Sequence, residues 1–294
     1  PNFYARRMDL IRIHIIPAIG GIQLLKLKPV DIKSFYNDLA RSGRKPRVRK
    51  NGKIIPLKED TPKGLSPATI RQIHNILNPA MKQAIKEGLV PRNVVSDVSP
   101  PKIVKTRTAK PLTKEQAQLY LAVLKDDRLF AGFVLELTTG LRRGELRGLQ
   151  WKDLQDGYLS IQRQIIRVID QENGTTSLEY TDLKTPTSHR RIALPELTLA
   201  ELELHREKQN TEKEAAGGGY QDEDLIFCDE RGHKLDTRRF YNIHTKALST
   251  ANLDHTAFHD LRHTVATLLL QAGESIKTVQ DLLGHADVET TLND

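Results

Sequence analysis

Two arginines and two histidines in short motifs are the residues of this chain best suited to chemistry. Arg142 follows a Gly-Leu pair. Arg262 lies three positions after His259, and His285 follows Leu-Leu-Gly in a later run. A guanidinium group binds phosphate oxygens through parallel N–H bonds, and a histidine exchanges a proton near neutral pH. The sequence therefore predicts a site that holds one phosphate group.

The transfer of a phosphodiester between oxygens needs a nucleophile, cations on the non-bridging oxygens and a proton for the leaving oxygen. Many nucleases supply the cations as two metal ions held by clustered Asp and Glu. The sequence shows no such acidic cluster and no metal-ligand motif beside its arginines. We therefore expect arginines, rather than a metal ion, to hold the phosphate.

Helical spacing relates several of these residues to one another. Glu145 lies three positions after Arg142, within reach of its guanidinium, although an ordinary ion pair on a helix explains the spacing equally well. His259 and Arg262 are also three apart, so they share one face of the helix that they begin. His263 follows His259 by four positions, a zinc-binding spacing, but the Glu of a His-Glu-x-x-His site is absent. We interpret His263 as a packing residue or a support for the site.

Four runs of the chain, in this order, resemble the tyrosine recombinase (phage integrase) family, whose pattern is Arg…Lys…His-x-x-Arg…His…Tyr: 138–146, 182–186, 258–264 and 282–285. The resemblance implies that the catalytic residues are Arg142, Lys184, His259, Arg262 and His285. It assigns the phosphate clamp to the two arginines and the proton of the nucleophile to His259. Lys184, in a hairpin turn between two β segments, would protonate the leaving 5′-oxygen.

The attacking tyrosine of the family comes shortly after the histidine of Leu-Gly-His, which places it directly after Asp294. None of the seven tyrosines of this chain has a matching context. Tyr241 follows Arg238-Arg239-Phe240 and is expected to pack on its helix. We therefore expect this chain to be part of an intact recombinase whose nucleophile follows Asp294.

The resemblance also implies a function, that of a site-specific recombinase acting as the integrase of a phage or of an integrative and conjugative element. No metal, nucleotide or other cofactor is implied, because a link between tyrosine and a 3′-phosphate keeps the energy of the broken bond. The implied partners are double-stranded recombination sites and further copies of the chain, as a tetramer on two sites. Type IB topoisomerases share this chemistry, and a DNA-binding regulator could keep the fold without a nucleophile, so both remain alternatives.

Charge is distributed unevenly along the chain. Residues 1–108 hold 22 Lys and Arg against 7 Asp and Glu, a net charge of +15, whereas the remainder holds 23 against 30, a net charge of −7. A basic first part suits contact with a polyanion such as DNA. The single cysteine, Cys228, excludes an internal disulfide and fits a cytoplasmic location. No run approaches the roughly 18 apolar residues of a membrane span, so no membrane partner is expected.

A chain of 294 residues suits two domains better than one. Residues 1–100 predict a helical core DNA-binding domain, in which Pro29 opens one helix and Ser66 caps another that ends at Gly88. A basic β-hairpin is expected as an insertion at about 44–57, where Asn51-Gly52 is the turn signal. The proline-rich residues 101–111 predict a linker.

Residues 112–294 predict the catalytic domain, whose first helix starts at a capping box of Thr113 and Gln116. We expect β segments near 157–168, 177–183 and 189–194, a buried strand at 225–228, and helices after about 196. Gly284 is expected to end the helix that precedes His285. The fold class is therefore α+β: a mainly helical core-binding domain plus a mixed α/β catalytic domain, which in the family form a C-shaped DNA clamp.

Contacts to DNA are expected from the basic hairpin, the helix that begins at Ser66, the turn near Lys184 and two pairs of adjacent arginines. Arg143 is placed here because it cannot share a helix face with Arg142. The full set is Arg44, Lys45, Arg47, Arg49, Lys50, Lys53, Ser66, Thr69, Arg71, Arg143, Thr185, Ser188, Arg238 and Arg239.

Overall fold

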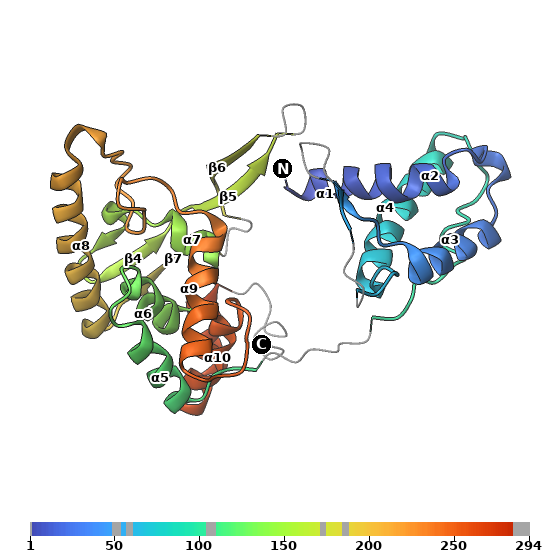
Figure 1. Ribbon diagram of the computed structural model, residues 1–294. Helices are drawn as coiled ribbons and strands as arrows, with labels where there is room; N and C mark the ends of the chain where they lie inside the picture. The colour runs from blue at the N-terminus through green and yellow to red at the C-terminus, as the bar shows by residue number, and fades with distance from the viewer. Residues whose placement is uncertain are drawn as a thin grey trace. The chain divides into compact units, whose positions relative to one another are not determined.

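The computed structural model describes residues 2–48, 54–56, 61–103, 110–170, 175–183 and 188–284. The chain divides into two compact units (Figure 1). One unit comprises Pro1–Thr106 and Ile169–Thr176, and the other comprises Arg107–Val168 and Ser177–Asp294. Each unit has its own large hydrophobic core.

The first unit is mainly helical. A continuous helical run begins the chain, a short 3₁₀ turn follows, and two longer helices pack against this run and against each other. The buried core contains Ile32, Phe35, Ile70 and Ile73. Its helices are α1 (Asn2–Leu10), the π-helical η1 (Ile11–Ile15), α2 (Ile16–Ile19), η2 (Leu24–Lys26), α3 (Pro29–Ser42) and α4 (Pro67–Lys86).

The two longer helices begin at the residues that the sequence signals predicted. Helix α3 starts at Pro29, whose ring fixes a helical φ where no N–H is needed. Before α4, the Ser66 hydroxyl accepts the Thr69 backbone N–H at 3.3 Å. Gly88 follows the end of α4 with a φ of 70°, a conformation that glycine adopts without strain. Local capping therefore sets the ends of both helices.

A pair of short antiparallel strands lies in the interval expected for the basic hairpin. Strand β1 (Arg47–Val48) pairs with β2 (Ile54–Ile55), with Arg47 opposite Ile55 and Val48 opposite Ile54. The expected turn at Asn51-Gly52 and three of the expected DNA-contact residues, Arg49, Lys50 and Lys53, lie outside the described residues.

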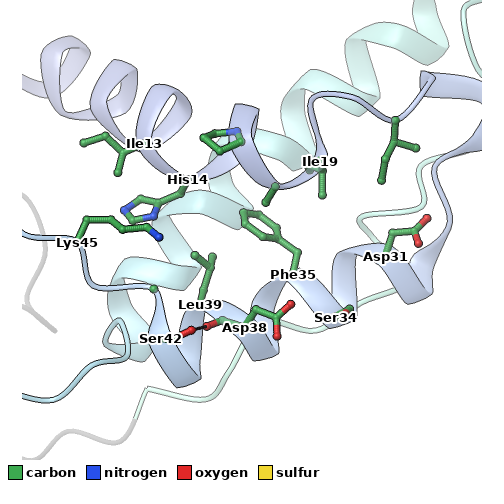
Figure 2. Close-up of a pocket in the computed structure, with 14 residues that line it drawn as sticks. Ile13, His14, Ile19, Asp31, Ser34, Phe35, Asp38, Leu39, Ser42 and Lys45 are labelled. Atoms are coloured by element: carbon green, nitrogen blue, oxygen red, sulfur yellow. Dashed lines mark hydrogen bonds between the residues drawn. The ribbon is translucent and has the colours of Figure 1, made fainter.

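A cavity of about 400 Å³ opens between the first helical run and α3. Figure 2 shows the Phe35 ring facing it, with His14 and Lys45 next to each other. Burial and, secondarily, the nearby Lys45 ammonium lower the pKa of His14. Lys45, one of the expected DNA contacts, is thus an exposed cation at the edge of this cavity.

The second unit combines helices with small sheets. Helix α6 packs against both α8 and α10, and α11 packs against α10 and one strand, β7. The helices are α5 (Lys114–Leu124), α6 (Phe130–Thr139), α7 (Arg143–Gly148), η3 (Trp151–Asp153), α8 (Glu196–Ala216), η5 (Gly217–Gly219), α9 (Thr237–Thr250), α10 (Asp260–Gln271) and α11 (Ile276–Leu283). The strands are β3 (Leu154–Gln155), β4 (Tyr158–Ile161), β5 (Gln164–Ile169), β6 (Thr176–Thr181) and β7 (Arg190–Ala193).

These strands form two sheets among the described residues. Strands β3, β4 and β7 make an antiparallel sheet in that order, with Tyr158 opposite Ala193 and Ile161 opposite Arg190. Strands β5 and β6 make a separate two-stranded sheet. The expected β segments are therefore present, but β6 and β7 do not pair with each other. Strand β6 before Lys184 pairs with β5, and strand β7 after it pairs with β4, whereas Lys184 itself lies outside the described residues.

The expected strand at 225–228 is wrong. Leu225 and Cys228 make only isolated bridges, to Gln150 and Lys234. Cys228 is nevertheless buried, as expected, and its sulfur accepts a hydrogen bond from the Gln209 side chain at 2.8 Å. The segment is held by side-chain bonds and isolated bridges. The sequence did not indicate this, because a short apolar run does not show whether a neighbouring strand is present to pair with it.

A polar pair lies inside the aromatic core of the second unit. The Tyr120 hydroxyl donates to Nδ1 of His244 at 2.8 Å, and His244 Nε2–H donates to the Thr256 carbonyl at 3.1 Å. The carbonyl can only accept, so His244 is the neutral tautomer with its proton on Nε2. Burial lowers the pKa of His244 to about 4.

This pair predicts that acid destabilises the second unit. Between pH 6.5 and 4 the unfolded chain protonates His244 and the folded chain does not, so the free energy of unfolding falls as pH falls. We expect the contribution of His244 to the free energy of unfolding to fall by about 2 kcal/mol between pH 7 and pH 5. Urea unfolding of the wild type and of His244→Gln, which can still accept from Tyr120 and donate to Thr256, measures the difference. Parallel pH profiles for the two proteins would contradict the prediction.

None of the helices in the described ranges is both long and apolar enough to cross a lipid bilayer.

Candidate active site

Arg142 stands at the start of α7, where its own helix orients it. It precedes the helix in an extended conformation, after Gly140 has ended α6 in the left-handed region. Its backbone N–H donates to Glu145 Oε2 at 3.1 Å, and its Nη1 donates to Glu145 Oε1 at 2.8 Å. The Arg142 side chain is 35% exposed, whereas that of Glu145 is 2% exposed. A buried carboxylate therefore holds a guanidinium that remains accessible.

Glu145 has a second cationic partner that the sequence did not indicate. Arg190 Nη2 donates to Glu145 Oε2 at 3.0 Å, so the carboxylate lies between two arginines. Burial pushes the pKa of Glu145 up, but Arg190 and Arg142 outweigh burial and lower it below its ordinary value. Glu145 is therefore ionised at neutral pH and contributes a fixed negative charge beneath Arg142.

Arg262 reaches the same cluster from α10. It is 1% exposed, and it donates through Nη1 to the Gly140 carbonyl at 2.7 Å and through Nη2 to the Leu283 carbonyl at 2.5 Å. Burial, and next the positive charge of Arg142, lower the pKa of Arg262 to about 10. The two arginines are thus close enough for their positive charges to repel each other.

The end of α11 completes the cluster. Gly284 ends this helix with a φ of 67°, as the sequence predicted, and its carbonyl accepts a weak bond from Arg142 Nη2 at 3.4 Å. His285 is the next residue in the chain, and it lies outside the described residues together with Lys184 and Thr185. The structure therefore brings Arg142, Glu145 and Arg262 to the point from which the chain continues to His285.

His259 is the residue immediately before α10 and has an exposed side chain. Its ring meets that of the half-buried His263 edge to face, with centroids 5.6 Å apart. Arg262, on the same turn of helix, is instead buried. The three side chains are thus divided into an exposed histidine, a histidine that packs behind it and an arginine fixed to backbone carbonyls.

Gly140 is required by both conformation and space. Its φ is 60°, and a Cβ built there would collide with the Leu283 side chain and lie 3.4 Å from Arg262 Cγ. We expect Gly140→Ala to lower the free energy of unfolding by about 2–4 kcal/mol, from backbone strain and overpacking together. Chemical denaturation measures the change. Gly273→Ala is the matched control, because Gly273 also has a positive φ but open space around it. This variant should lose only the free energy of unfolding that backbone strain costs. Equal losses would contradict the steric argument.

One expected DNA contact is wrong in its placement. Ser188 is 2% exposed and its hydroxyl accepts from Arg142 Nη1 at 3.3 Å, so it supports the arginine and does not face solvent. The sequence did not indicate this because burial of a serine in a connecting segment is decided by tertiary packing.

The other expected DNA contacts fall into three groups. Arg143, Arg238 and Arg239 are exposed, and Arg239 approaches Glu230 at 3.9 Å. Arg71 is half-buried, and its guanidinium donates one hydrogen bond to the Pro101 carbonyl at 3.4 Å. The remaining described members are the half-buried Arg44 and Thr69, the exposed Lys45 and Ser66, and Arg47, described in its backbone alone.

Two buried charged residues of the site were missed from the sequence. Arg190 lies on β7, where Ile192 on the same face is buried and Arg191 is exposed, so strand alternation could have indicated that Arg190 points inward. Glu136 on α6 is 1% exposed. Burial raises the pKa of Glu136 well above its ordinary value, although Arg262 opposes that rise.

Within the described ranges, no group of three or more His, Cys, Asp and Glu side chains is arranged to hold a metal ion.

Comparison with known proteins gives consistent results for the two parts of the chain. The phage integrase family matches residues 110–294, and the N-terminal SAM-like domain of phage integrases matches residues 1–40. A tyrosine recombinase XerC-like protein of Caldanaerobacter subterraneus subsp. tengcongensis is 29% identical over 287 residues, covering 93% of this chain and 68% of that protein. An integrase of Streptomyces ambofaciens is 28% identical over 292 residues, covering 95% of this chain and 66% of the integrase.

Among solved structures, the Tn1549 transposon integrase in complex with transposon right end DNA shares the fold. The TM-score is 0.75 at 23% identity, covering all of this chain and 88% of that one.

Proposed function

Because the chain belongs to the phage integrase family, we propose that it acts as a site-specific DNA recombinase, which cuts and rejoins strands through a tyrosine–3′-phosphate link. The observation that carries this proposal is the cluster of Arg142 and Arg262, two arginines from distant parts of the chain. Arg142 is held by the buried Glu145 carboxylate, and Arg262 is held by two backbone carbonyls. Guanidinium groups fixed in this way are preorganised for the charge that develops on a phosphate in the transition state.

The proposed mechanism gives each residue a separate task. Arg142 and Arg262 hold the non-bridging oxygens, and His285 adds a further contact from the end of α11. A tyrosine attacks the phosphorus, its proton is handled by His259, and the bond from phosphorus to the 5′-oxygen breaks. Lys184 gives a proton to that leaving oxygen. The freed 5′-hydroxyl of a partner strand then attacks the tyrosyl phosphate, which restores the DNA and releases the enzyme.

The nucleophile is proposed to be a tyrosine that directly follows Asp294, in agreement with the motif spacing of the family. Residues 1–100 are proposed as the core DNA-binding domain, residues 101–111 as a linker and residues 112–294 as the catalytic domain. The basic charge of the first part supports this division. Each DNA phosphate that a Lys or Arg neutralises releases counterions, and this release strengthens binding. We further propose that four copies assemble on two DNA sites and that the element served is a phage or an integrative element.

The test uses the chain extended past Asp294 in its native reading frame and a duplex that it selects from a random-sequence library. Versions of this duplex with a nick moved by one nucleotide at a time trap the covalent intermediate, because the short cleaved fragment diffuses away. The reaction is run in chelator and separated on a denaturing gel. We expect protein joined to DNA, and we expect the band to disappear when the tyrosine after Asp294 is changed to phenylalanine.

Tight binding with no covalent band at any nick position would refute the proposal and favour a DNA-binding regulator. A band that survives the change to phenylalanine would refute the assigned nucleophile alone.

A further inference from the structure

Arg190 connects three separate segments of the catalytic unit. Its Nε donates to the Leu282 carbonyl at 2.8 Å, its Nη1 to the Ser188 carbonyl at 3.0 Å and its Nη2 to Glu145 Oε2 at 3.0 Å. The side chain is 7% exposed. All three nitrogens of the Arg190 guanidinium are therefore engaged with the protein.

The contact with Leu282 is one of three similar contacts at the end of α11. Three successive carbonyls, those of Leu282, Leu283 and Gly284, accept hydrogen bonds from Arg190, Arg262 and Arg142 in turn. Carbonyls in the last turn of a helix lack partners within the helix and carry the negative end of its dipole, so cations stabilise them. The arginine cluster therefore holds the helix end that leads to His285.

Arg190 differs from Arg142 in what it can do. Arg142 is partly exposed and is available to an anion, whereas Arg190 is buried and bonded to the carboxylate that orients Arg142. Its strand neighbour Arg191 is exposed and lies over the Tyr158 ring at 4.3 Å. The two adjacent arginines on β7 thus have different surroundings, one inside the cluster and one on the surface.

We propose that Arg190 is a positioning residue for the reaction, which fixes Arg142 through Glu145 and fixes the end of α11 through Leu282. It links the phosphate clamp to the segment that brings His285, and it makes no contact with DNA. This inference rests on the proposed recombinase function. Displacement of catalytic groups by about 1 Å can cost about 10²-fold in rate, so the loss of such a link is large even without contact to substrate.

The experiment compares Arg190→Met, Arg190→Lys and the matched surface control Arg191→Met. Single-turnover formation of the covalent complex at saturating protein measures the chemical step, and titration of the same duplex measures affinity. We expect Arg190→Met to react about 10²-fold more slowly with its Kd changed by less than about threefold. Arg190→Lys should recover about tenfold of that loss, because the ammonium keeps the charge beside Glu145 but one nitrogen cannot serve three acceptors. Arg191→Met should behave like the wild type.

Amide hydrogen exchange provides a readout that does not depend on catalysis. In Arg190→Met the amides of 280–284 should exchange about tenfold faster than in the wild type, because the last turn of α11 loses an anchor. Arg191→Met should leave them unchanged. If Arg190→Met does not fold, Arg190→Lys serves for both measurements, with a smaller change in the same direction.

Three results would overturn the inference. They are equal cleavage rates in the Arg190 and Arg191 variants, a loss confined to Kd, or unchanged exchange at the end of α11. A wild-type chain that forms no covalent complex would instead count against the proposed function, and the exchange measurement would still decide the role of Arg190.

Discussion

Arg262→Ala is expected to lower the rate of covalent complex formation by about 10³-fold or more, the range found for arginines that stabilise phosphoryl transfer. Arg262 is fully buried and fixed by the carbonyls of Gly140 and Leu283, so its charge is preorganised before DNA arrives. The variant leaves both carbonyls without this donor, and we expect a loss of about 2–4 kcal/mol in the free energy of unfolding as well. Single-turnover cleavage and urea unfolding measure the two effects.

Arg262→Lys separates the effect on chemistry from the effect on folding. The lysine keeps a positive charge but is shorter and has one nitrogen, which cannot bond both carbonyls and a phosphate in fork geometry. We expect it to fold, to bind the duplex and still to react about 10²-fold more slowly than the wild type. Arg191→Ala, at an exposed arginine of β7, is the control and should retain wild-type cleavage. A lysine variant with wild-type rate would show that charge alone is sufficient.

Arg142→Ala is expected to have the second large effect. It should slow the chemical step of cleavage and change the free energy of unfolding little. Its side chain is 35% exposed and its strongest partner is the Glu145 carboxylate at 2.8 Å. Loss of this cation removes the accessible half of the clamp, so we expect about 10³-fold slower cleavage at saturating protein. The free energy of unfolding should change by less than about 2 kcal/mol, because Glu145 keeps Arg190 as a partner.

Arg143→Ala is the matched control, because Arg143 is adjacent to Arg142, whose guanidinium donates to Glu145 and Ser188. Arg143 is exposed and is proposed to contact the DNA backbone. Its loss should weaken binding and reduce the dependence of log Kd on log salt by about one unit, with the cleavage rate at saturation preserved. A larger loss of rate in Arg143→Ala than in Arg142→Ala would reverse the assignment.

Local sequence signals were sufficient for several of the described helix ends. Ser66 and Thr113 cap helices as predicted, and Gly284 ends α11 in the left-handed conformation. These signals work because a cap is made by groups a few residues apart, so its chemistry is fully contained in the local sequence. The site motifs were recognisable for a similar reason, because Arg142 with Glu145 forms a contact within one turn of helix.

Sequence alone did not determine which strands pair or which polar side chains are buried. Strands β6 and β7 were expected to form a hairpin around Lys184, but each pairs with a different strand. Ser188 was expected to face DNA and is buried against Arg142. Pairing and burial depend on residues far apart in the chain, and period-two alternation indicates which face a residue is on but not what covers that face.

The sequence by itself therefore predicted the chemistry proposed for the molecule: a phosphate clamp of two arginines with histidines beside it, in a chain whose first part is strongly basic. The tertiary structure alone decided how that clamp is held. Arg190, Arg262 and Arg142 come from three segments, yet they bond three successive carbonyls at the end of one helix. Only the folded chain brings these segments together, because buried guanidinium groups must find acceptors wherever packing places them.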